Sequence, residues 1–181
     1  MIVKSIKSSK EIKKNSEYYP LEYITKLVIK DELGLDYLLK RTKKAEYKEW
    51  STIFNVTEQN GTGSISNILT EEEVEKKYPK YHTSIDSVHF SREQAQEDGF
   101  QGFQHYHPIP GAFNYKISLF DRSSPKNFID LLTFNRSGGK GPEIIGYNHN
   151  SVFIPTNKQK TKFAAATPEQ IMRYLETGKL F

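Results

Sequence analysis

The chain has 181 residues, of which 36% are hydrophobic, 27% charged and 13% aromatic, and its formal net charge at pH 7 is +4. Its 11 Phe, 11 Tyr and one Trp supply large apolar side chains for a core, which excludes disorder of the whole chain. Cysteine is absent, which excludes disulfides, thiolate nucleophiles, iron–sulfur clusters and thiolate zinc ligands. We expect neither a membrane span nor a signal peptide, and a cytoplasmic location, because apolar runs are short and lysines interrupt the first residues.

The length corresponds to one domain with short appendages. We expect a poorly ordered basic lead-in over residues 1–20, a folded domain over 21–157, and a basic linker with a C-terminal helix over 158–181. Basic and acidic residues alternate in blocks along the chain, and only the short run 158–162 resembles a cationic binding stripe. Nucleic acid is therefore an unlikely partner, and no membrane partner is expected.

The first part of the chain carries alternating strand and helix signals. Asp31 is a candidate N-cap for a helix in which leucines recur at helical spacing, and Thr70 is a candidate cap for an acidic helix. A Gly-containing turn over 59–63 predicts a hairpin. The predicted elements up to residue 107 are strands over 26–30, 50–56, 64–69, 87–90 and 102–107, and helices over 31–44, 70–77 and 91–97.

The remaining predicted elements are a helix over 127–132, a glycine-rich loop over 137–142, and a hairpin of 143–147 with 151–154. Thr167 as N-cap and Gln170 at the third helical position, with proline at the first, predict a last helix. Its apolar face consists of Ile171, Tyr174 and Leu175. The sum predicts an α/β chain of the α+β type, a single domain with a mixed, mainly antiparallel sheet flanked by helices.

The sharpest chemical signal is a pair of histidines on the strand predicted over 102–107. Residues i and i+2 of a strand face the same side, so His105 and His107 project together. Two imidazoles placed in this way can share one metal ion, and zinc suits them when sulfur ligands are absent. The nearest downstream carboxylate is Asp121. The alternative is two half-exposed histidines with no ligand.

The residues around this pair extend the pattern. His105-x-His107-Pro108 followed by Ser118-x-x-Asp121 resembles the motif of the JAB1/MPN/Mov34 metalloproteases, the JAMM-type isopeptidases. The stretch between Pro108 and Ser118 is longer than in that family, which implies a bulging loop.

The resemblance covers about residues 24–155 and implies a JAB/MPN-like domain over 21–157. Members of the family place a glutamate at the start of the strand that follows the first helix. Glu49 stands at the corresponding place here, directly before a segment with strong strand character, and Glu46 is a rival for the same role.

The resemblance also implies a role for each residue of the motif. His105, His107 and Asp121 would hold Zn²⁺, and water would take the fourth position. Glu49 would act as general base, and Ser118 would donate a hydrogen bond to the oxyanion. The implied activity is that of a zinc metallopeptidase or isopeptidase acting on a protein substrate, such as one linked to ubiquitin or a ubiquitin-like modifier.

Three other interpretations stay open. The first is a catalytically inactive JAB/MPN-fold module that binds another protein. The second is a cupin-type metal protein, although residues 108–116 lack the glutamate that such a motif needs. The third is a metal-dependent nuclease, which the weak clustering of basic residues disfavours. The oligomeric state is not determined by the sequence.

Overall fold

The computed structural model describes residues 21, 23–44, 48–83, 88–89, 92–107, 127–136, 141–149 and 151–180. The strands are β1 (Lys26–Ile29), β2 (Ser51–Gln59), β3 (Thr62–Ser66), β4 (His82–Thr83), β5 (Val88–His89), β6 (Gly102–Tyr106), β7 (Ile129–Asn135), β8 (Pro142–Tyr147), β9 (Val152–Pro155) and β10 (Lys162–Ala165). The helices are α2 (Glu32–Lys44), α3 (Glu71–Lys77), α4 (Arg92–Glu97) and α6 (Pro168–Thr177). Several expectations fall on residues outside this part of the chain: the lead-in over 1–20, the bulging loop between Pro108 and Ser118, the site residues Ser118 and Asp121, most of the glycine-rich loop, and Glu46.

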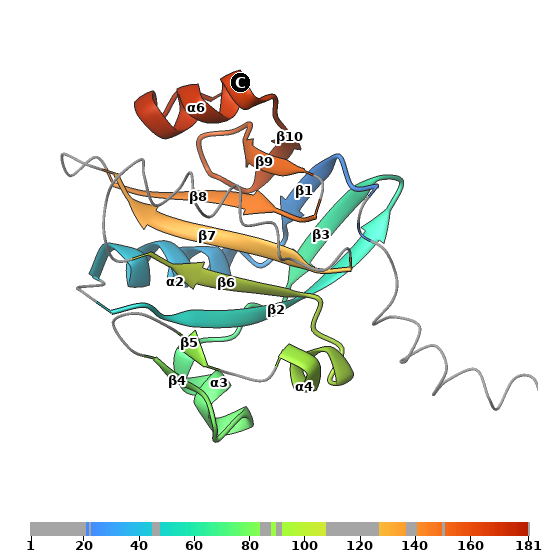
Figure 1. Ribbon diagram of the computed structural model, residues 1–181, viewed down its shortest axis with the longest axis vertical. Coiled ribbons are helices and arrows are strands. Elements are labelled where there is room, and N and C mark those ends of the chain that lie inside the picture. The colour runs from blue at the N-terminus through green and yellow to red at the C-terminus, as the bar shows by residue number, and fades with distance from the viewer. Residues whose placement is uncertain are drawn as a thin grey trace, which may run out of the picture.

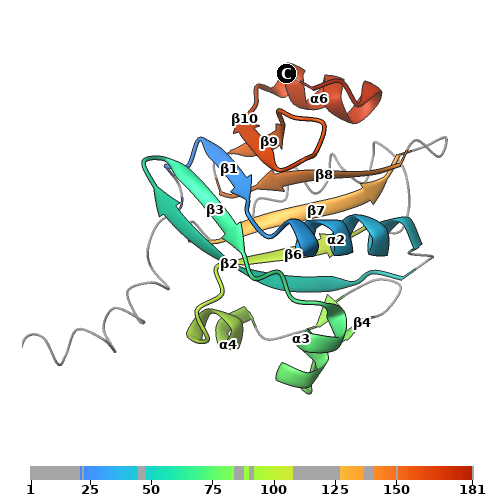
Figure 2. The ribbon, with the colours of Figure 1, turned by 180° about the vertical axis from the view of Figure 1, so that it is seen from behind.

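The strands form a closed barrel in the order β1-β10-β9-β8-β7-β6-β2-β3, and β4 pairs with β5 in a separate small sheet (Figures 1 and 2). Neighbouring strands of the barrel are antiparallel except in two pairs, β1 with β3 and β6 with β7. The first strand closes the barrel because it pairs on both sides. Val28 lies opposite Lys162 of β10 on one side and opposite Ser64 of β3 on the other.

This closure shows that the predicted fold class is wrong. The sequence predicted a mixed, mainly antiparallel sheet flanked by helices, of the JAB/MPN type, whereas the sheet is a closed barrel with short helices around it. The reason is that periodicity identifies strands but carries no information on which strands become neighbours. The antiparallel pairing of β10 with β1 and the parallel pairing of β1 with β3 remove the free edges that an open sheet would have.

Helix α2 packs its apolar face into the inner core of the barrel. Leu35 and Leu38 belong to the same buried cluster as residues of β1, β2, β6 and β7. The predicted cap is confirmed, because the Oδ1 atom of Asp31 accepts a hydrogen bond from the Gly34 amide at 2.8 Å. The Oδ2 atom accepts a second one, at 2.8 Å, from the amide of Ile68 after β3. One side chain therefore begins the helix and fastens it to the barrel.

The other helices cover parts of the outer face. Helix α6 packs on β7, β8 and β9, and its predicted apolar face is confirmed, since Ile171, Tyr174 and Leu175 are buried there. Its predicted N-terminus is also confirmed, with a capping box between Thr167 and Gln170. Helices α3 and α4 cover the outer side of β2 through a second apolar cluster. Thr70 caps α3 as expected.

The helix predicted over 127–132 is wrong, because strand β7 begins at Ile129 and contains the last four of these residues. Ile129 and Leu131 face the inner core, while Leu132 and Phe134 face the cluster under α6. A strand buried on both sides shows no alternation of polar and apolar residues. Such a short apolar run cannot be told from a helix by periodicity alone.

Strand β10 was not predicted. It lies within the range interpreted as a basic linker, directly after a lysine-rich stretch, and only Phe163 of its four residues is buried. It is part of the barrel because it pairs with β1 on one side and with β9 on the other. The structure confirms the other predicted strands and helices up to residue 107, with shifted boundaries. It also confirms the hairpin of β8 and β9.

Candidate functional site

Strand β6 presents alternate side chains to the two sides of the barrel wall. Gln104 and Tyr106 are buried toward the interior, whereas Phe103, His105 and His107 are half-buried on the outer side. The rings of His105 and His107 lie side by side, with centroids 4.9 Å apart and planes inclined by 56°. The strand thus brings the two imidazoles to one face, as expected from their spacing.

Aromatic rings surround His105. The Phe103 ring stacks on it with centroids 5.3 Å apart and an angle of 19°, and the Tyr147 ring of β8 meets it edge-on at 6.2 Å. Phe103 in turn contacts Phe128, with ring centroids 5.7 Å apart. Rings from β6 and β8 therefore fix the orientation of the His105 imidazole. A fixed ring suits a metal ligand, and it equally suits a side chain that only packs.

Burial affects the protonation of His107. Desolvation disfavours the charged imidazolium and lowers the pKa of His107 from its ordinary value. The neutral form therefore predominates at pH 7, and a neutral imidazole keeps one nitrogen lone pair that can accept a hydrogen bond or bind a metal ion.

The register of β2 and β6 relates Glu49 to the histidines. Ser51 lies opposite His105, and the Tyr106 amide donates a hydrogen bond to the Trp50 carbonyl at 3.0 Å, one residue beyond the paired strand. The same register, extended by one more pair, brings Glu49 opposite His107. Glu49 is half-buried. Residues that face each other in an antiparallel pair share one side of the sheet, so the predicted base lies on the side of the two imidazoles.

Two further residues belong to the predicted site. Ser118 and Asp121 lie outside the described residues. Within the residues that the structure describes, no group of three or more His, Cys, Asp or Glu side chains is arranged to hold a metal ion. Among the described residues, the site therefore consists of two neighbouring imidazoles, with Glu49 on the same side of the sheet and without a third side chain that completes a metal site.

Asp130 is a residue that the sequence analysis missed. It lies on β7, is 3% exposed, and by register stands between Phe103 of β6 and Tyr147 of β8. Its side chain is on the outer side of the wall because Leu131, the next residue, faces the inner core. The signal that could have identified this buried carboxylate is a single acid within an otherwise apolar run, in the segment predicted as a helix over 127–132.

Comparison with known proteins assigns no family to the chain. No protein-family model matches it, and no curated protein matches it significantly. Over the residues described by the structure, none of the helices is long and apolar enough to cross a lipid bilayer.

Proposed function

We propose that the protein is a zinc-dependent hydrolase that cleaves a peptide or isopeptide bond at the outer face of β6. The observation that carries this proposal is the pair His105 and His107, whose ring centroids are 4.9 Å apart on one side of the barrel wall. The likeness to the JAB1/MPN/Mov34 family rests on the motif residues alone, since the fold expected from it was wrong.

The residues of the described part fit a zinc site in their chemistry. Neutral imidazole is a common zinc ligand, and burial favours the neutral form of His107. His105 and His107 would hold the ion through ring nitrogens, and Asp121 is proposed as the third ligand. Bound zinc lowers the pKa of a coordinated water toward about 7 and so makes a nucleophile available near neutral pH.

The remaining roles belong to the chain's own polar groups. The Glu49 carboxylate would accept a proton from the attacking water and deliver it to the departing amine. The Ser118 hydroxyl would donate a hydrogen bond to the oxyanion that develops on the cleaved carbonyl. No covalent intermediate with the protein is needed. The proposed substrate is a protein, with ubiquitin or a ubiquitin-like modifier as one class.

A non-catalytic interaction module is the second candidate, and one specific observation favours it. His105 stacks on Phe103, which packs against the apolar cluster under α3 and α4. A histidine in such a position can serve packing alone. In that case neither imidazole needs a ligand, and the outer face would act by binding a partner protein.

Zinc content tests the proposal. Zinc per chain is measured by elemental mass spectrometry after chelation and reconstitution of the wild type, the double variant His105→Ala/His107→Ala, and the control His149→Ala. We expect about one zinc per chain in the wild type and the control, and none in the double variant. Zinc that is absent from the wild type, or retained by the double variant, would contradict the proposal and leave the interaction module as the better explanation.

Two further variants test the individual roles. Glu49→Gln should bind zinc like the wild type but lose hydrolysis of ubiquitin-like isopeptide substrates, because an amide cannot accept the water's proton. Full activity would remove Glu49 from the mechanism. Asp121→Ala should lose zinc, and unchanged zinc binding would show that another residue is the third ligand.

A further inference from the structure

Strands β2 and β3 are joined by a two-residue turn, Asn60-Gly61. Gln59 pairs with Thr62 across this turn, and both turn residues have positive φ, 52° at Asn60 and 77° at Gly61. Positive φ at both central positions defines the type I′ turn, which fits the twist of a hairpin and which the pair Asn-Gly favours. Asn60 is exposed. The turn therefore presents an asparagine side chain to water, directly before a residue that has no side chain.

This pair of residues permits a covalent reaction within the chain. The Gly61 nitrogen attacks the Asn60 Cγ atom, the Cγ–Nδ2 bond breaks, and the Gly61 amide proton leaves with Nδ2 as ammonia. The product is a five-membered succinimide ring. Water then opens the ring at one of its two carbonyl carbons and yields either aspartate or isoaspartate. Glycine allows the ring to form because it has no Cβ atom beside the attacking nitrogen.

Hydrogen bonds hold Gly61 on both sides in the folded chain. Its amide donates to the Glu58 Oε1 atom at 2.8 Å, and its carbonyl accepts from the amides of Thr25 at 2.9 Å and Lys26 at 3.3 Å. The carboxylate opposes the reaction, because it binds the proton that the attacking nitrogen must lose and because its charge disfavours a negative nitrogen beside it. The reaction therefore requires the turn to open locally.

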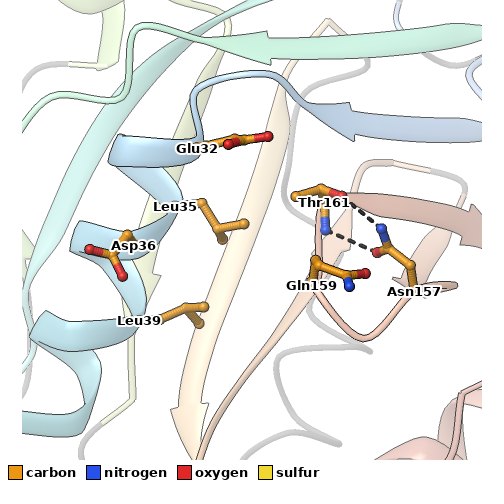
Figure 3. Close-up of a pocket in the computed structure, with 7 residues that line it drawn as sticks. All are labelled: Glu32, Leu35, Asp36, Leu39, Asn157, Gln159 and Thr161. Carbon is orange, nitrogen blue, oxygen red and sulfur yellow. Dashed lines mark hydrogen bonds between the residues drawn. The ribbon is translucent and has the colours of Figure 1, made fainter.

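Two other asparagines in the described part of the chain lack this combination of features. Asn67 is exposed and has the same φ of 52°, but it precedes the β-branched Ile68, whose side chain crowds the attacking nitrogen. The side chain of Asn157 is held by Thr161 (Figure 3), whose amide donates to Oδ1 at 3.0 Å and whose hydroxyl accepts from Nδ2 at 2.7 Å. Of these three asparagines, Asn60 therefore meets the least hindrance to ring closure.

We propose that Asn60 is a site of spontaneous deamidation and that the Glu58 carboxylate limits its rate by holding the Gly61 amide. Isoaspartate at this position routes the backbone through the former side chain and lengthens it by one methylene group. The Gly61 carbonyl then no longer meets the amides of Thr25 and Lys26. Because Lys26 begins β1 and β1 closes the barrel, the modification loosens this closure. The reaction consumes only water and does not depend on the proposed hydrolase site.

The test compares the rate of deamidation of the full chain in its folded state and in urea, both at pH 8. Peptide mass spectrometry measures conversion at Asn60 and Asn67, and labelling by isoaspartate methyltransferase detects the isomerised product. We expect Asn60 to convert before Asn67, and the folded chain to react about tenfold or more slowly than the unfolded chain, the scale of one charge-assisted hydrogen bond. Equal folded and unfolded rates, no conversion of Asn60 in the folded chain, or equal conversion of Asn67 would overturn the proposal.

Variants test the role of Glu58. Glu58→Ala removes the acceptor and should raise the rate in the folded chain about five- to tenfold, whereas Glu58→Gln keeps an acceptor oxygen without the charge and should give an intermediate rate. Thr57→Ala, at the exposed neighbouring position of β2, controls for a general weakening of the strand and should leave the rate unchanged. A rate that Glu58→Ala leaves unchanged or lowers would refute the role of the carboxylate.

Hydrogen exchange tests the structural consequence. In protein enriched in the isoaspartate form, the amides of Thr25 and Lys26 should exchange faster than in the unmodified protein, because they have lost their acceptor. The amide of Ile171 in helix α6, which donates to the Thr167 carbonyl at 3.0 Å far from the turn along the chain, is the internal control. Unchanged exchange at Thr25 and Lys26 would contradict the loosening of the barrel.

Discussion

The guanidinium group of Arg136 contacts Tyr174 of helix α6 in two ways. Its Nη2 donates a hydrogen bond to the Tyr174 carbonyl at 2.7 Å, and its central carbon lies 5.5 Å from the centre of the Tyr174 ring. Its Nη1 donates to the Leu175 carbonyl at 2.5 Å. The last turn of α6 contains no basic residue, so Arg136, which follows β7, supplies the cation that a helix C-terminus favours. This contact fastens the helix to the barrel.

Replacing Arg136 with Met should lower the free energy of unfolding by about 2–4 kcal/mol. The variant loses both carbonyl contacts, and it removes a positive charge 3.5 Å from the buried carboxylate of Glu143, which also accepts a hydrogen bond from the Tyr174 hydroxyl at 2.7 Å. Urea unfolding measures the change. The control Lys158→Met, at an exposed position, should stay within about 0.5 kcal/mol of the wild type. Equal stability of both variants would show that the contact is dispensable.

The stability of the protein should depend on the hydroxyl group of Tyr81. That hydroxyl donates a hydrogen bond to the Ser51 carbonyl at 2.7 Å and accepts one from the Ser51 amide at 3.1 Å. Tyr81→Phe leaves both buried backbone groups without this partner, so we expect a loss of about 1–3 kcal/mol by chemical unfolding. Tyr23→Phe is the matched control, because Tyr23 is 74% exposed. A change in Tyr81→Phe no larger than in the control would refute the role.

Gly102 should not tolerate a side chain. A Cβ atom at this position of β6 would lie 1.9 Å from the Cε2 atom of the buried Phe54 ring. Gly102→Ala should therefore destabilise the fold by about 1–3 kcal/mol. Adding Phe54→Leu should recover part of that loss, because the ring responsible for the clash is gone. A double-mutant cycle measured by thermal unfolding tests this, and strict additivity of the two changes would exclude the clash as the cause.

Acid should destabilise the metal-free protein partly through His107. Burial lowers the pKa of His107 in the folded state, whereas the unfolded chain keeps a histidine pKa of about 6.5. Once the pH falls below that unfolded-state pKa, the unfolded chain binds more protons than the folded chain. Stability therefore falls with decreasing pH. His107→Gln should lose less stability than the wild type between pH 7.5 and pH 5, as measured by urea unfolding with chelator present. A variant with the same loss as the wild type would contradict burial of the neutral imidazole.

The sequence by itself determined the features that depend on neighbouring residues. The caps at Asp31, Thr70 and Thr167 follow from side chains that bind backbone amides three residues away. The apolar face of α6 and the shared face of His105 and His107 follow from helix and strand periodicity. Such interactions form within one or two turns of chain, so local residue types are enough to predict them.

Only the tertiary structure decided which segments meet. Barrel closure depends on Val28 lying between Lys162 and Ser64, which are far from it along the chain. Burial on both faces makes β7 a strand, although its local pattern favoured a helix, and the pairing of β7 sets Asp130 between Phe103 and Tyr147. The free energy of these contacts comes from apolar area buried between distant segments. A pattern read along the chain does not contain that information.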